Sequence, residues 1–132
     1  MSTAAKSNTT VLQTYLETLD AAPLDVLPLL APGFTFSVLW ADENGAKEFA
    51  GGLDAFHGYL EQRDPEGHVH HVLGAARFGK TEILFGRTSR HGKPLASFVN
   101  AADIDDQGRL ENFFGARTTT LSFGELVLAG AA

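Results

Sequence analysis

The sequence predicts a single α+β domain in which a curved, cone-shaped antiparallel sheet wraps around three helices in the N-terminal half. The first half contains three short segments with helical spacing of apolar residues and one strand hairpin. The second half contains four longer strand-like segments joined by short, turn-rich loops, which favour antiparallel neighbours. Three helices are too few to cover both faces of six strands, so we expect the sheet to bend and leave an apolar pocket.

The helices are predicted from capping and periodicity. Thr10 and Gln13 have the spacing of a capping box, and apolar residues with helical period follow until the helix ends near Asp20. A second, shorter helix is predicted before Pro32, which ends it. The second and third helices are expected at residues 24–30 and 53–63.

The strands are predicted from two-residue alternation and from turns. Phe34, Phe36 and Val38 alternate with small or polar residues, as in a strand with one buried face. The dipeptide Asn44-Gly45 predicts a tight turn into a partner strand. The six strands are expected at residues 34–40, 46–50, 69–78, 81–90, 95–104 and 109–118.

Length and composition fit one cytoplasmic domain. The chain has 132 residues, of which 44% are hydrophobic, so it can form its own core. The absence of cysteine excludes disulfides and thiolate sites and agrees with a cytoplasmic location. No secretory signal or membrane-spanning run is visible. We expect a disordered tail at residues 1–8, the domain at 9–120, and a tail at 121–132 that packs on the domain or on a dimer partner.

The charge of the chain limits its partners. The formal net charge is −6, and no stretch of the sequence is basic. This balance argues against nucleic acid and acidic membranes as partners. We therefore expect a small, hydrophobic, neutral or cationic molecule, or another protein.

The order of these elements, together with Val11–Asp25, Ala50–Arg63 and Ile104–Leu110, resembles the nuclear transport factor 2 superfamily and, within it, the SnoaL-like proteins. The resemblance covers residues 9–118. It implies a cystatin-like α+β barrel and a homodimer formed through the outer face of the sheet. The superfamily includes isomerases, dehydratases, cyclases, epoxide hydrolases and non-catalytic binding modules, so the fold alone does not assign an activity.

Ketosteroid isomerase is one member that can be compared residue by residue. Tyr15 falls where that enzyme has its oxyanion-hole tyrosine, and Asn100 falls where it has the protonated aspartate of the same hole. Its general-base aspartate would fall on or beside Val38. Valine cannot transfer a proton, so this comparison lacks its central residue.

Scytalone dehydratase is the second member that can be compared in this way. The segment His71–Lys80 resembles, without a gap, the strand that carries one of its catalytic histidines, and His71 takes that position. Asp20 can be placed on its catalytic aspartate and Ser97 on a pocket serine. Its first-helix tyrosine is Leu19 here, and its second catalytic histidine has no secure match.

His71 is the first candidate for catalysis. An imidazole titrates near neutrality, so it can take a proton beside a carbonyl or give one to a leaving hydroxyl. Asp20 would orient or assist it, and Tyr15 would donate a hydrogen bond to a substrate oxygen. The alternatives are a structural histidine, a helix-capping aspartate and a core tyrosine. A shift of one residue in strand register would instead make His70 the pocket residue.

Further pocket residues are expected on the strands. Ser97 and Asn100 lie on opposite faces of one strand, so only one of them faces the pocket. His68 and His70 form a two-histidine pair, but a metal site needs a third ligand and the next strand offers only Glu82, so we expect no metal. Aromatic side chains are expected to form the walls: Phe36, Trp40, Phe56, Phe85, Phe98 and Phe114.

These features favour a cofactor-free lyase or isomerase, of dehydratase or cyclase type. It would act on a small hydrophobic cyclic carbonyl or hydroxyl compound through acid–base chemistry of His71. The alternative is a non-catalytic ligand-binding or dimeric assembly module of the same fold. A hydrolase with an activated water would need an inward-facing Asp–Arg–Asp set, which we do not find in the sequence.

Overall fold

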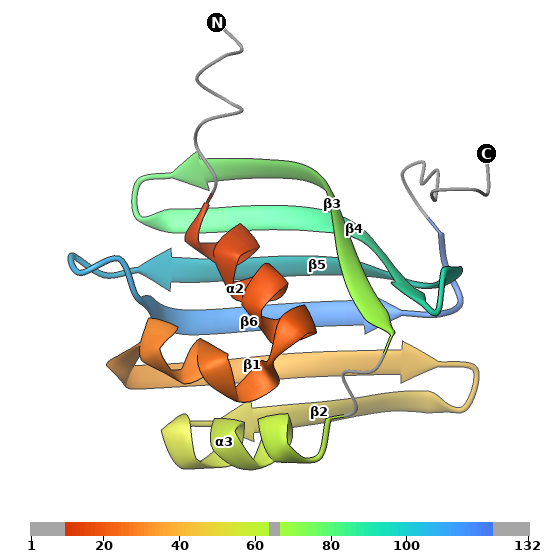
Figure 1. Cartoon of the computed structure of the whole chain (residues 1–132), viewed down its shortest axis with the longest axis horizontal. Coiled ribbons are helices and arrows are strands. Elements are labelled where there is room, and N and C mark those ends of the chain that lie inside the picture. Colours follow the sequence, from red (N-terminus) through yellow and green to blue (C-terminus); the bar gives the residue numbers. More distant parts are fainter. Residues whose placement is uncertain (1–9, 64–66, 123–132) are drawn as a thin grey trace, which may run out of the picture.

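The computed structural model describes residues 10–63 and 67–122 (Figure 1). The predicted tail at residues 1–8, and the predicted C-terminal tail after Leu121 and Ser122, lie outside these ranges. The described elements, in chain order, are α2 (Val11–Ala21), the 3-10 helix η1 (Pro23–Leu29), β1 (Leu30–Asp42), β2 (Gly45–Gly51), α3 (Leu53–Glu61), β3 (His68–Phe78), β4 (Thr81–Arg90), β5 (Lys93–Ile104) and β6 (Leu110–Thr118).

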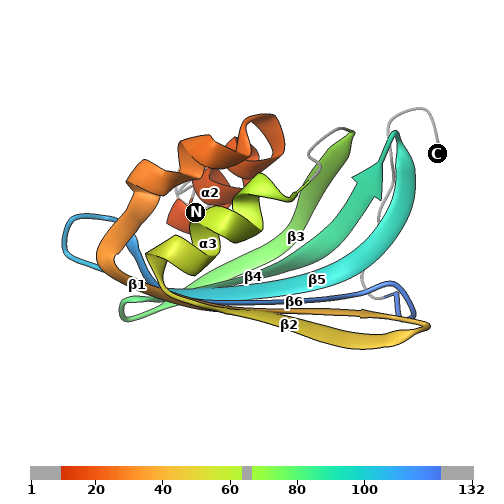
Figure 2. The same ribbon diagram turned by 90° about the horizontal axis from the view of Figure 1, so that it is seen from below.

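The strands form one six-stranded sheet in the order β2-β1-β6-β5-β4-β3. The helices lie on one face of this sheet, which curves up around them on the side of β3, β4 and β5 (Figure 2). This confirms the predicted α+β fold with a curved sheet around helices. The sheet differs from the prediction in one pairing, because β1 and β6 run parallel while the other neighbours are antiparallel. Short loops predict only the pairing of consecutive strands, and this pair joins the two halves of the chain.

The N-terminal end of α2 is held by two sets of hydrogen bonds. The predicted capping box forms, with the Gln13 amide donating to Thr10 Oγ1 and the Thr10 amide donating to Gln13 Oε1, both at 3.0 Å. The Leu12 amide donates to Oε1 of Glu82 on β4 at 3.0 Å, and Arg77 Nη1 donates to the other carboxylate oxygen at 3.2 Å. Glu82, which is only 2% exposed, thus joins the helix to the sheet.

The second helix departs from the prediction. It is a 3-10 helix, with Pro23 in its first turn and Pro28 inside it. Proline lacks the amide hydrogen that an α-helical turn needs, which favours the shorter 3-10 form. Pro32 does not end this helix but lies within β1, where the pairing with β6 shifts register between Leu30 and Thr35. Of the helices in the described residues, none is both long and apolar enough to cross a membrane.

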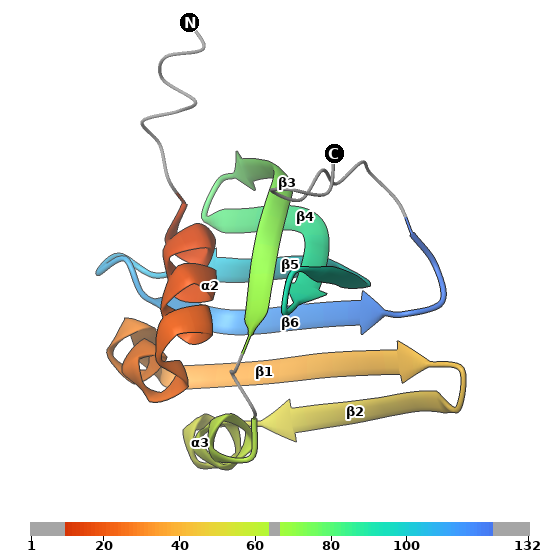
Figure 3. The ribbon, with the colours of Figure 1, turned by 45° about the vertical axis from the view of Figure 1, so that its right-hand side comes forward.

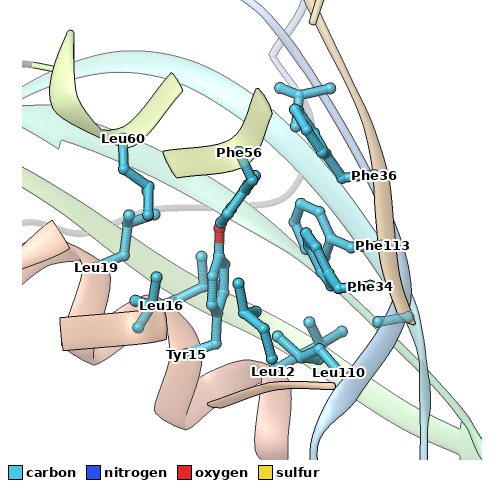
Figure 4. Packing of buried hydrophobic residues seen from close by; sticks show 14 of the residues in the cluster. Leu12, Tyr15, Leu16, Leu19, Phe34, Phe36, Phe56, Leu60, Leu110 and Phe113 are labelled. Atoms are coloured by element: carbon cyan, nitrogen blue, oxygen red, sulfur yellow. The ribbon is translucent and has the colours of Figure 1, made fainter. Parts of the chain in front are cut away.

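The core lies between the helices and the sheet, and aromatic rings gather in the part of it over β1 and β6. The ring of Phe56 on α3 packs edge-on against Phe34 and Phe36, with centroids 4.9 and 4.7 Å apart. Tyr15 extends from α2 toward Phe56 (Figure 4), and the centroid of its ring lies 5.2 Å from that of Phe113 on β6. Each such pair contributes about 0.5–1.5 kcal/mol beyond the burial of its surface. This packing fixes α2 and α3 over the sheet and so positions the residues of the pocket beside it.

Candidate active site

A pocket lies beside this core, between α2, the end of α3 and the inner face of the sheet. Its cavity volume is ≈ 40 Å³. A water needs about 10–15 Å³ by this measure, so the pocket is narrow. Its walls are apolar at Leu16, Leu19, Val38, Trp40, Phe98 and Phe113, and its polar side chains are Tyr15, Tyr59, Arg63, His70, Asn100 and Arg117.

His70 and Asp20 form a hydrogen-bonded pair in this pocket. Asp20 lies in the last turn of α2, and its Oδ1 is 2.7 Å from Nδ1 of His70. Its Oδ2 accepts the backbone amide of His70, also at 2.7 Å. A carboxylate only accepts hydrogen bonds, so Nδ1 of the neutral imidazole carries the hydrogen and Nε2 is unprotonated. This Nε2 has no hydrogen-bond partner in the described part of the chain and remains available to a ligand.

The surroundings of His70 favour its neutral form. Burial, the largest effect, lowers the pKa of His70 below its ordinary value, and the charges of Arg63 and Arg117 lower it further. The hydrogen bond and charge of Asp20 oppose this shift. The ring also meets the edge of Phe98 with centroids 5.0 Å apart. The result is an oriented imidazole that is neutral at neutral pH and can accept a proton.

Tyr15 and Asn100 supply hydrogen-bond donors to the same pocket. Burial raises the pKa of Tyr15 far above its ordinary value, so the phenol keeps its proton. Neither the Tyr15 hydroxyl nor the Asn100 amide group has a side-chain hydrogen bond to another described residue. Gly115 on β6 leaves room for Asn100, because a Cβ there would lie 2.9 Å from Asn100 Oδ1.

Two arginines complete the polar lining. Arg63 follows α3, and Arg117 lies near the end of β6 with its guanidinium 4.3 Å from the centre of the Trp40 ring. Burial lowers the pKa of Arg117, as does the charge of Arg63, while Tyr59 opposes the shift. Stacking on an indole ring stabilises a guanidinium in such a setting.

Solved structures with the same arrangement identify the fold. IdmH from Streptomyces antibioticus, a proposed polyketide cyclase, matches with a TM-score of 0.63 and 13% identity over 81% of this chain and 88% of that one. A proposed isomerase of the SnoaL-like family from Agrobacterium tumefaciens matches at 0.57, with 20% identity over 81% and 93%. An NTF2-like protein of unknown function from Cytophaga hutchinsonii matches at 0.54, with 14% identity over 81% and 86%. The chain has the NTF2-like fold.

The likeness is one of structure, since comparison of the sequence with protein-family models and with curated proteins finds no match. At these identities it establishes the NTF2-like fold of this chain and nothing about its activity. The activity therefore has to be argued from the pocket.

In the structure His71 does not face the pocket, which corrects the expectation from the sequence. The inward histidine is His70, and His71 Nε2 instead lies 2.8 Å from Ser89 Oγ. The reason is a bulge between Val72 and Gly74, in the strongly bent β3 (Figure 3). The side chains that face the helices are at even positions before the bulge and at odd positions after it, where Arg77 reaches Glu82. Counting back in twos from Arg77 therefore puts His71 on the wrong face.

The other expected site residues divide between three places. Tyr15, Trp40 and Asn100 line the pocket, as does Phe98, and Asp20 is bound to His70. Ser97 lies on the opposite face of β5 from Asn100, which resolves that alternative in favour of Asn100. The expectation for the remaining aromatic walls is corrected: Phe36 and Phe56 are buried in the core, while Phe85 and Phe114 lie on the outer face of the sheet, 36% and 41% exposed.

Arg63, Arg117 and Tyr59 are pocket residues that the sequence did not single out. Arg117 lies an even number of residues after Phe113 and Gly115 on β6, so the alternation of that strand could have predicted that it faces inward. Arg63 follows the last turn of α3 and carries no such signal. Among the described residues, no group of three or more histidine, aspartate or glutamate side chains could hold a metal ion.

Proposed function

We propose that this protein is an acid–base enzyme of the lyase or isomerase type that acts without a cofactor on a small hydrophobic carbonyl or hydroxyl compound. The observation that carries this proposal is the His70–Asp20 pair, with a 2.7 Å contact at Nδ1 and an available Nε2 on the pocket. A base held in one tautomer and one orientation by a carboxylate is the arrangement that proton transfer needs.

In the proposed reaction, Nε2 of His70 takes a proton from the carbon next to a substrate carbonyl. Negative charge develops on the carbonyl oxygen, and Tyr15 and Asn100 donate hydrogen bonds to it. The resulting imidazolium is stabilised by its hydrogen bond to Asp20 and by the charge of that side chain. The imidazolium then returns the proton to another carbon, which completes an isomerisation, or gives it to a β-hydroxyl that leaves as water, which completes a dehydration.

The walls of the pocket limit the substrate. Trp40 and Phe98 offer flat apolar surface, and Leu19 adds to it, so the narrow pocket suits a single ring or a short branched chain.

A non-catalytic ligand-binding module is the second candidate. The small free space favours it, because a binding pocket can be filled by one small molecule without room for a change of geometry. The absence of a carboxylate at Val38, which also lines the pocket, agrees with this alternative.

Exchange of substrate protons for deuterium tests the proposed chemistry whatever the final product is. Small cyclic ketones and cyclic β-hydroxy ketones are incubated with the protein in D₂O. NMR follows the loss of the substrate's α-proton signal, which reports exchange, and the elimination of water from the hydroxy ketones, which reports dehydration. His70→Gln should slow the catalysed exchange about 10²–10⁴-fold, the usual contribution of a general base. His71→Gln is the matched control, because it alters the neighbouring imidazole, bound to Ser89, and should leave the rate unchanged. No exchange with the natural protein, or equal rates for both variants, would contradict the proposal and favour the binding module.

A further inference from the structure

The mouth of the pocket has a positive charge that the net charge of the chain does not predict. The formal net charge is −6, yet the pocket lining contains Arg63 and Arg117 and no aspartate or glutamate. The charges of these two arginines reach the same group of residues, because both lower the pKa of His68 and of His70. Asp20 lies behind His70, with its Oδ1 2.7 Å from Nδ1, and supplies one negative charge. The two guanidinium groups of the lining therefore outnumber this one carboxylate, which is already hydrogen-bonded to His70, and a molecule in the pocket meets two cations.

Neither arginine has a carboxylate partner in the described part of the chain. Nε of Arg63 is buried and makes no hydrogen bond, although five N–H donors are available on each guanidinium. By contrast, Arg77 Nη1 donates to Glu82 at 3.2 Å, and Arg109 Nε, which also makes no hydrogen bond, still has the Asp105 carboxylate 3.5 Å away as an ion-pair partner. Buried charges are normally paired, since leaving water without a partner is costly. A half-buried guanidinium with one unpartnered nitrogen, beside a second that has no carboxylate partner among the described residues, points to a ligand that arrives from outside.

The two arginines also oppose each other. Arg63 is one cause of the lowered pKa of Arg117, which means that their charges are close enough to repel. Arg117 gains from its position 4.3 Å over Trp40, but this contact does not neutralise its charge. An anion between the two groups would remove the repulsion and provide acceptors for their N–H groups. A planar carboxylate matches the donor geometry of a guanidinium best.

We propose that Arg63 and Arg117 form a carboxylate-binding subsite, so that the natural ligand is a small apolar acid whose ring or chain lies against Trp40 and Phe98. This inference deepens the proposed function, on which it rests for the reaction, because it names the class of substrate. The carboxylate binds at the arginines, and the reacting carbon lies toward His70, Tyr15 and Asn100. The neutral or cationic ligand expected from the net charge is replaced by an anionic one.

Binding of benzoate and of benzamide, measured by calorimetry, tests this subsite. The two probes have the same ring and nearly the same shape, and they differ in charge. Trp40, the one tryptophan of the chain, gives a second readout through its fluorescence. Charge-assisted hydrogen bonds should make benzoate bind about tenfold to a hundredfold more tightly than benzamide.

The variants assign the preference to the two arginines. Arg63→Gln/Arg117→Gln should bring the benzoate-to-benzamide ratio to about one, and Arg63→Lys should keep part of the preference. Lys93→Gln/Arg109→Gln is the matched control, because it removes the same charge from residues that do not line the pocket and should keep the full preference. Equal affinity for the two probes, failure of benzoate to bind at millimolar concentration, or a preference that persists in the double arginine variant would overturn the subsite.

The same probes separate this inference from the proposed chemistry. His70→Gln should keep the carboxylate preference, because Nε2 is not part of the subsite. If that variant keeps the preference and also keeps the proton exchange of the natural protein, the reaction is wrong and the subsite stands. If exchange is lost in His70→Gln but benzoate shows no preference, the reaction stands and the subsite is wrong.

Discussion

The two ends of helix α2 use similar polar side chains in different ways. At the N-terminal end, Thr10 and Gln13 cap the helix, and the buried Glu82 accepts hydrogen bonds from Leu12 and Arg77. At the C-terminal end, Asp20 orients His70, while the donors around them point at a pocket without partners among the described residues. Polar groups that are all hydrogen-bonded to one another stabilise the fold, whereas polar groups without partners are available to a ligand. The difference identifies the C-terminal end as the functional one.

The energetic contrast follows from the same contacts. A buried carboxylate that accepts hydrogen bonds from a helix amide and an arginine contributes to stability as long as every partner is present. A guanidinium nitrogen that is buried without a partner, as Nε of Arg63 is, costs stability, because it has lost its hydrogen bond to water. Functional sites commonly carry such a cost.

Removal of Glu82 should have the largest effect on stability. Glu82→Ala leaves the Leu12 amide and Arg77 without their acceptor and creates a cavity, so the free energy of unfolding should fall by about 3 kcal/mol. Arg63→Gln, in the pocket near the C-terminal end of α2, should change the free energy of unfolding by less than about 0.5 kcal/mol, because Nε of Arg63 has no hydrogen bond to lose. Urea unfolding of both variants measures the difference. Similar losses in the two variants would mean that the ends of the helix do not differ as described.

A smaller effect should appear in the pH dependence of stability. The pKa of His70 is lowered in the folded protein, by burial against the opposing influence of Asp20 and with the help of Arg63 and Arg117. The unfolded chain therefore binds a proton more readily, and stability should fall as the pH decreases from about 6.5 to the folded pKa, by up to about 1.4 kcal/mol per pH unit. Above about 6.5 the contribution is fully present.

The variant that checks this slope is His70→Gln, in which the fall in stability below about pH 6.5, the unfolded value, should be shallower. His68, whose pKa is also lowered by burial, should account for the slope that remains, and a His68→Gln/His70→Gln variant should lose both parts. Urea unfolding at a series of pH values measures it. An unchanged slope in His70→Gln would assign the effect to other groups.

Local sequence patterns predicted most of the fold. The capping box of Thr10 and Gln13 is present, and the Asn44-Gly45 turn joins β1 to β2 with Gly45 at a φ of 124°, a conformation that favours glycine. The parallel pairing of β1 with β6 was not predictable in the same way. It depends on contacts between residues such as Val38 and Gly115 that are far apart in the chain.

The candidate site was predictable only in part, again because it depends on contacts between residues that are far apart in the chain. Asp20, Tyr15 and Asn100 were identified by resemblance, and all three lie at or beside the pocket. The choice between His70 and His71 depended on a bulge that no local pattern reveals. Arg63 becomes a pocket residue only because α3 packs on β1 and β2 in the folded protein, which brings the residue after its end to the pocket.

The central claim is that Asp20 holds His70 with its hydrogen on Nδ1 and with an unprotonated Nε2 on the pocket. Two-dimensional ¹H–¹⁵N NMR of the histidine side chains, followed through a pH titration, tests it directly. We predict that at neutral pH His70 has the Nδ1–H tautomer and that its pKa lies below the ordinary value of about 6.5. An Nε2–H tautomer, or a His70 pKa above that value, would contradict the account.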